Sequence, residues 1–148
     1  MKMLIDNKGG NIRQSKINDG KLLMNNQLMT DPSYNSNMVF WQFGVDIDEL
    51  ESVPIKTFNE KYSAANGINL QFDALIDFPI VVGDLLYDKR RNLYWICIES
   101  FDRDEILCAG KLVRCNYIMK WQDENTNIFE YPVFEINSTQ YNSGEFGD

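Results

Sequence analysis

The sequence predicts a mainly β protein, a small antiparallel β-barrel or SH3-like meander with an extended N-terminal arm and at most two short helices. Three observations support this fold class. Apolar and polar residues alternate with a period of two in residues 70–78 and 112–121, as they do in half-buried strands. Charged turns at residues 89–92 and 102–105 separate the apolar runs between these segments. Hydrophobic residues make up 44% of the 148 residues, which is enough for one compact core.

Residues 1–37 are predicted to form a flexible, basic N-terminal arm. The segment is polar and rich in turn-forming residues, but it carries an apolar strip, interpreted as one short amphipathic turn or an extended contact surface, at Leu22, Leu23, Met24, Leu28 and Met29. The first 30 residues have a net charge of +3, whereas the rest of the chain carries −11. Such a segment is too polar to fold alone, and the apolar strip is unfavourable in water, so we expect it to become ordered when it docks on a partner. A permanently solvated tail is the alternative.

The predicted β-rich domain spans residues 38–148. An aromatic run opens it, and Asp46 is placed to cap a short helix over residues 47–52, which Pro54 ends. Residues 59–67 are interpreted as a loop or a single helical turn.

The meander is predicted over residues 70–136. Its strands are expected near residues 70–78, 84–88, 93–99, 106–121 and 128–136. The last strand is assigned to a sheet edge, because Pro132 has no amide proton for a ladder hydrogen bond. The tail after residue 136 is interpreted as a loop.

The strand ending at residue 121 has the clearest alternation in the chain. Its odd-numbered residues from 113 onward are Val113, Cys115, Tyr117, Met119 and Trp121, and they share one face. The sequence therefore predicts that Trp121 belongs to the core.

The residues that carry chemistry predict no enzyme, cofactor or metal site. The chain has no histidine to activate a serine nucleophile, and no Gly-x-Ser-x-Gly or phosphate-loop pattern. The acidic turn around residues 99–105 lacks the ligand order of a calcium loop. The three cysteines, Cys97, Cys108 and Cys115, lack a Cys-x-x-Cys spacing, and we expect reduced, buried thiols.

The charge pattern and the hydropathy exclude some classes of partner and favour others. The acidic body repels phosphates, which disfavours general DNA binding. No apolar run reaches the length of a signal-peptide core or a membrane span, so we expect a soluble protein with no membrane partner. The predicted hairpin tip at Lys89, Arg90 and Arg91 carries three adjacent cations, which are costly to bury. The tip is a candidate docking point for an acidic partner, with simple solubility as the alternative.

Two motifs resemble structural proteins of tailed bacteriophages. The first is Gly-Asp-Leu at residues 83–85 followed by Tyr-Trp-Ile at 94–96, which many small β-barrels share. The second, more particular, is Arg-Cys-Asn-Tyr at residues 114–117 leading to Lys-Trp at 120–121. Together they resemble small neck, head-completion or head–tail connector proteins over roughly residues 72–141.

This resemblance implies a barrel-like domain that assembles as a ring between portal and tail. The implied partners are copies of the chain, portal or other neck proteins, and tail proteins, with packaged DNA nearby but not specifically bound. The implied location is the virion, after assembly in the host bacterial cytoplasm. The arm strip and the hairpin tip are then the expected partner-binding residues.

Two alternatives remain from other functional classes. One is an OB-type module that binds single-stranded nucleic acid by stacking bases on Trp95, Tyr117 and Trp121. The other is a small phage protein that inhibits a host factor.

Overall fold

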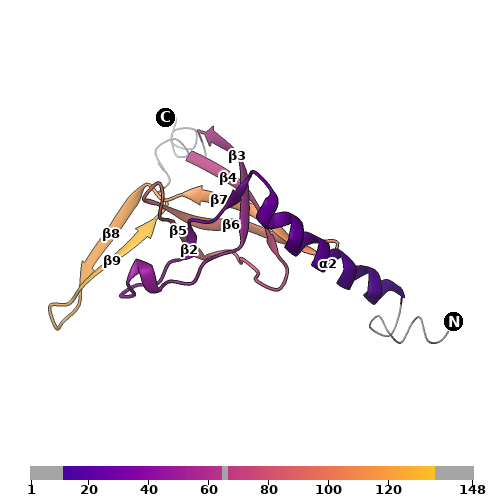
Figure 1. The fold of residues 1–148 in the computed structure, drawn as a ribbon. Helices are drawn as coiled ribbons and strands as arrows, with labels where there is room; N and C mark the ends of the chain where they lie inside the picture. Colours follow the sequence, from indigo (N-terminus) through magenta and orange to yellow (C-terminus); the bar gives the residue numbers. More distant parts are fainter. Residues whose placement is uncertain (1–11, 65–66, 136–148) are drawn as a thin grey trace.

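The protein is mainly β and antiparallel, as its sequence predicts (Figure 1). The computed structural model describes residues 12–64 and 67–135. The elements are α2 (Ile12–Thr30), β1 (Tyr34–Asn35), β2 (Met38–Phe40), the 3₁₀ helix η1 (Ile47–Glu49), β3 (Ile55–Ser63), β4 (Gly67–Leu75), β5 (Leu85–Asp88), β6 (Leu93–Arg103), β7 (Leu107–Arg114), β8 (Tyr117–Gln122) and β9 (Ile128–Val133).

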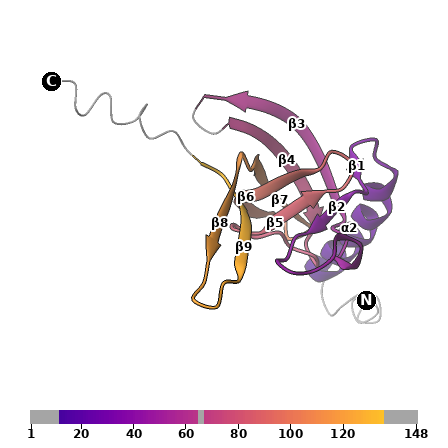
Figure 2. The same ribbon diagram turned by 90° about the vertical axis from the view of Figure 1, so that its left-hand side faces the viewer.

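Seven of these strands curl into a nearly closed barrel (Figure 2). Their order in the sheet is β1-β3-β4-β7-β6-β5-β2, with every neighbouring pair antiparallel. The two outermost strands, β1 and β2, are separated in the chain only by Ser36 and Asn37. This short connection draws the two ends of the sheet together, and the Lys89 amide donates to the Asn37 carbonyl at 3.0 Å, which extends the β2–β5 ladder up to the connection.

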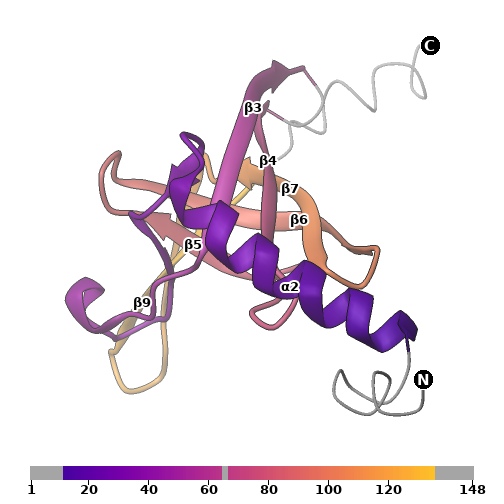
Figure 3. The ribbon, with the colours of Figure 1, turned by 45° about the vertical axis from the view of Figure 1, so that its right-hand side comes forward.

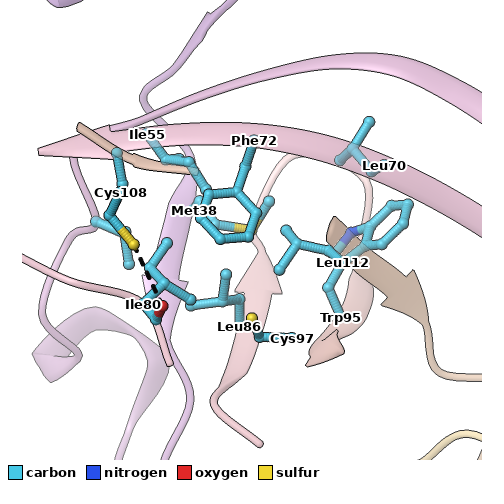
Figure 4. Close-up of a cluster of buried hydrophobic side chains, with 12 residues drawn as sticks. Met38, Ile55, Leu70, Phe72, Ile80, Leu86, Trp95, Cys97, Cys108 and Leu112 are labelled. Carbon is cyan, nitrogen blue, oxygen red and sulfur yellow. Dashed lines mark hydrogen bonds between the residues drawn. The ribbon is translucent and has the colours of Figure 1, made fainter. Parts of the chain in front are cut away.

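The core fills the inside of this barrel (Figure 4). Trp95 and Phe72 are its largest fully buried side chains. The thiol of Cys108 donates to the carbonyl oxygen of Ile80 at 3.4 Å, which satisfies a polar group within the core. The other members of the cluster are Met38, Val53, Ile55, Leu70, Ala74, Ile80, Leu86, Cys97 and Leu112.

The expectation of an extended arm is wrong for residues 12–30, which form α2 lying across the barrel (Figure 3). Ile17 and Met24 are partly buried and Leu28 is buried, a spacing that places them on one face of a helix. Gly20 lies so close to Ile106 that a Cβ would meet its side chain at 2.5 Å. Isolated helices of this kind are marginal in water, so packing on the barrel stabilises one that local composition does not indicate. Residues 1–11 of the predicted arm, and the tail from residue 136, lie outside the described residues.

Two ion pairs join α2 to loops of the barrel. Arg13 pairs with Glu105 at 2.9 Å, and Lys21 pairs with Asp77 at 3.3 Å. The pairs are largely solvent-exposed, so each contributes little to stability. Basic residues of α2 thus pair with acidic residues of the same chain. The apolar packing of Leu28 contributes more to holding the helix on the barrel.

We expect Leu28→Ala to lower the free energy of unfolding by about 2–3 kcal/mol, because it empties a buried position between helix and barrel. Leu22→Ala on the exposed side of α2 is the matched control and should change it by less than about 0.5 kcal/mol. Urea denaturation followed by circular dichroism measures both. Equal effects of the two substitutions would contradict this placement of the helix.

Three predicted segments differ from the structure or match it in part. Residues 59–67, expected to be a loop or a single helical turn, belong largely to β3 and β4, because a bulge lets β3 continue past Phe58. The predicted helix over residues 47–52 is only η1, and the Asp46 side chain makes no capping hydrogen bond. The predicted strand 106–121 is two strands, β7 and β8, because the chain leaves the barrel at Cys115 and Asn116. The turns at residues 89–92 and 102–105 are confirmed, with the second lying at residues 104–106.

The cysteines are free thiols in a protected setting, as predicted, with Cys97 and Cys108 buried and Cys115 partly buried. Burial raises the pKa of Cys97 to about 11, although a backbone hydrogen bond with Glu99 opposes the shift. Burial also raises the pKa of Cys115 to about 11. Both thiols are therefore protonated, and poorly nucleophilic, at neutral pH.

We expect Cys97 and Cys115 of the native protein to react with Ellman's reagent at pH 8 about a hundredfold more slowly than in the unfolded protein, because so little of their thiolate form is present. The unfolded thiols titrate near the ordinary value of 9.0, below the folded value of about 11. As the pH rises, the thiols of the folded state therefore stay protonated to a higher pH than those of the unfolded state. This contribution to stability is complete below pH ~9 and is lost as pH rises toward 11. Rapid labelling of the native protein at pH 8 would contradict the assignment.

Candidate functional site

The Arg114–Tyr117 motif is the point where the chain leaves the barrel and enters a separate two-stranded ribbon of β8 and β9. The Cys115 amide still donates to the Tyr94 carbonyl of the barrel at 2.9 Å. The side chain of Asn116 then pairs like a backbone: its Nδ2 donates to the Glu135 carbonyl at 2.9 Å, and its Oδ1 accepts from the Glu135 amide at 2.7 Å. These bonds fix the base of the ribbon.

Among the residues that the structure describes, the strands of the ribbon pair only with each other, and the ribbon projects from the barrel (Figure 1). Its register runs from Tyr117 opposite Val133 to Gln122 opposite Ile128. Pro132, opposite Ile118, lies in a strand with one hydrogen-bonded neighbour, which confirms its predicted edge position. A two-stranded ribbon is marginally stable alone, so other contacts must stabilise it.

Asp123 closes the turn at the far end of the ribbon. Its Oδ1 accepts from the amides of Asn125 and Asn127, both at 2.9 Å, and its Oδ2 accepts from the Asn127 side chain at 3.0 Å. The Asn127 side chain, followed by its backbone amide, lowers the pKa of Asp123 below the ordinary 3.8. The bonded carboxylate is therefore retained until the pH falls through this lowered value, and the turn stays closed at physiological pH.

One face of the ribbon is aromatic. The ring of Trp121 stacks on Phe129 with centroids 5.4 Å apart, and on Tyr131 at 5.5 Å. Phe43, from the loop after β2, covers the β9 side of this face and lies 5.3 Å from Phe129. Trp41 completes the connection to the barrel, because its ring lies edge-on to Tyr131 at 5.2 Å and to Tyr94 at 5.9 Å.

The β8 half of the same face remains open to solvent. Tyr117 is 56% exposed, Met119 45%, Trp121 42% and Phe43 41%, and we call these four residues the ribbon patch. The prediction that Trp121 belongs to the core is wrong. Alternation identifies which residues share a face, but the face of β8 lies beyond the barrel, so little covers it.

The predicted partner-binding residues differ in their exposure to solvent. Leu22, Leu23 and Met29 are exposed on α2, but Leu28 is buried within the chain and is not available to a partner. Lys89, Arg90 and Arg91 lie at the exposed β5–β6 hairpin tip, as expected.

The hairpin tip is built around a buried carboxylate. Asp88 Oδ1 accepts from the backbone amides of Arg90 and Arg91, and Asn92 adopts a left-handed φ of 55°. The Arg91 guanidinium pairs with Glu60 of β3 at 2.8 Å. The charge of Arg91 is thus paired within the molecule and is less available to a partner.

Sequence reasoning missed Phe43 and Met119 as surface residues. The alternation of Tyr117, Met119 and Trp121 was visible, but it gave no sign of what covers that face. Among the described residues, no three histidine, cysteine or acidic side chains are placed to hold a metal ion. No helix in the described ranges is both long and apolar enough to cross a membrane.

Comparison with known proteins assigns no family to this chain. No protein-family model, curated protein or solved structure matches it.

Proposed function

We propose that the protein is a non-enzymatic structural component of a phage virion, a head–tail connector or head-closure protein that assembles as a ring between portal and tail. The observation that supports assembly is the ribbon patch, an apolar aromatic surface on an element that projects from the barrel. The virion assignment is supported by the motif resemblance of residues 83–96 and 114–121. These residues include the base of the ribbon and part of its patch.

The physical argument for a partner starts from the uncovered rings. Apolar surface left in water is unfavourable by ~25 cal/mol per Å², and tryptophan, tyrosine and methionine are enriched where proteins meet. Phe43 and Trp41 already cover the β9 half of the face and hold it in position. A surface that is ordered in advance loses little conformational entropy on docking. The ribbon is therefore suited to insert against a neighbouring subunit.

A nucleic-acid-binding function has one observation in its favour, the exposure of Tyr117 and Trp121. The details oppose it. Trp95, the third residue of that hypothesis, is fully buried. The Trp121 ring is already stacked within the ribbon, and residues 117–133 contain one lysine against three carboxylates. Single-strand binding needs free ring faces beside cations.

Electron microscopy of the purified full chain tests the proposal. We expect closed rings of uniform diameter, because a head-to-tail interface closes when its rotation divides a full turn. A gel shift with single-stranded DNA at low salt should show no binding. A monomeric protein at all concentrations up to ~100 µM, or binding of the DNA, would overturn the proposal.

A further inference from the structure

A polar groove lies on the outer face of the barrel, apart from the ribbon. Its floor belongs to strands β4 and β7, which β3 and β6 flank in the sheet. Two adjoining hollows of about 530 Å³ and about 190 Å³ share Gln71, Glu99 and Lys111, so they form one continuous groove. The larger hollow falls in the range of small-molecule sites, about 300–1,000 Å³, and the smaller one beside it is lined by Asp73, Phe101 and Arg103.

Both flanking strands are bulged beside the groove. The register of β3 shifts between Phe58 and Lys61, and Asn59 adopts a left-handed φ of 54°. The register of β6 shifts at Ile98, between Cys97 and Glu99. Bulges re-aim side chains and are frequent next to binding sites. Here the side chain of Asn59 donates to Gln71 Oε1 at 2.7 Å, which sets two amides together at the groove.

Asp73 is the unusual residue in this groove. It follows the core residue Phe72, so it lies on the outer face, yet its side chain is only 10% exposed. Within the described part of the chain, its Oδ1 is buried and accepts no hydrogen bond. Lys56 lies opposite in register, but its ammonium pairs with Asp31 at 3.1 Å instead. The Arg103 guanidinium, 3.9 Å from Oδ1, is too distant for a hydrogen bond.

The charges of the smaller hollow favour a neutral ligand, because Asp73 and Glu99 balance Arg103 and Lys111 there, whereas Lys61 lies in the larger hollow. Arg103 near Asp73 would repel a cation, while Asp73 and Glu99 would repel a phosphate or a carboxylate. The Lys111 ammonium lies 3.6 Å from the Glu99 carboxylate, so the charges of this second pair also cancel each other. A buried acceptor without a partner is costly, and a hydroxyl group supplies the missing donor without adding charge. Backbone groups in the middle of the sheet are already paired, which leaves no edge for a peptide strand.

We propose that this groove binds a carbohydrate, a function beyond assembly through the ribbon. A sugar hydroxyl that displaces the half-exposed Arg103 side chain donates to Asp73 Oδ1, and Arg103 donates to a neighbouring sugar oxygen. Phe101, 46% exposed, is separated from Asp73 across the sheet only by the small side chain of Ala109. Its ring offers the apolar C–H face of a sugar a surface to pack on.

Saturation-transfer difference NMR of the full chain tests this proposal. The probes are the methyl glycosides of glucose, galactose, mannose, N-acetylglucosamine and rhamnose, each at ~10 mM. We expect at least one glycoside to bind, and Asp73→Asn to weaken that binding about tenfold or more because the charged acceptor is lost. Phe101→Ala should weaken it as well, and its exposed position makes this variant safe for folding.

Phe78→Ala is the matched control, because Phe78 is 49% exposed and does not line the groove. It should bind the glycoside like the unaltered protein. The mass of the assembled particle should be the same for all three variants, which separates this proposal from assembly. Absence of a signal with all five glycosides, or unchanged binding by Phe101→Ala, would overturn it.

Discussion

Trp95→Ala should lower the free energy of unfolding by about 3–5 kcal/mol, the largest loss expected from one truncation in this chain. The Trp95 side chain is fully buried in the barrel core. Removing it takes away apolar burial and leaves a cavity that the surrounding strands cannot fill. Urea denaturation followed by far-ultraviolet circular dichroism measures the change.

Trp121→Ala is the matched control, since it removes the same side chain from the ribbon patch. Because Trp121 is 42% exposed, we expect a loss of about 1 kcal/mol or less. If Trp121→Ala costs as much as Trp95→Ala, the ribbon packs against the barrel and the account of its exposed face is wrong.

Gly110→Ala should also destabilise the protein severely, by about 3 kcal/mol or more. A Cβ at Gly110 would collide with the backbone carbonyl oxygen of Glu99 on β6 and lie 3.0 Å from the Phe72 ring. The obstacle is backbone in the middle of a sheet, so no change of rotamer relieves it.

Gly44→Ala provides the comparison for the glycine prediction. Gly44 has a φ of 77° but no neighbour within 4 Å of an added Cβ, so its substitution carries backbone strain alone. We expect about 1 kcal/mol for that change. Thermal unfolding of both variants distinguishes the effect of backbone strain from that of a steric collision. A Gly110→Ala protein as stable as the Gly44→Ala protein would contradict the close approach of β6 and β7.

Strands β4, β5 and β6 of the barrel were predictable because local sequence specifies them, whereas β3 was not predicted. Alternation in β4 and the charged turns around β5 and β6 depend on neighbouring residues only, and the structure confirms them. The path of the chain after Arg114 was not predictable in this way. Cys115 and Asn116 continue the alternation, and the Cys115 amide still bonds to Tyr94 of the barrel. The non-local bonds between Asn116 and Glu135 then hold the chain in the ribbon instead of the barrel.

Helix α2 was missed for a related reason. Asn18, Asp19 and Gly20 form a typical turn sequence, and the apolar positions looked like a strip for a partner. Contacts of Gly20 and Leu28 with the molecule's own barrel override that local preference. The sequence also did not indicate that Asp73 is buried, because an aspartate in an alternating strand is expected to be exposed.

The central claim is that the ribbon patch joins subunits, and sedimentation velocity of the full chain between ~1 and ~100 µM tests it most directly. The test variant is the double substitution Met119→Ser with Trp121→Ser. The control is Ile128→Ser, at an exposed position on the opposite face of the same ribbon. We predict that the unaltered protein and the control form one large species, while the double variant requires about a hundredfold higher concentration to assemble. Equal assembly of the double variant and the unaltered protein would contradict the claim.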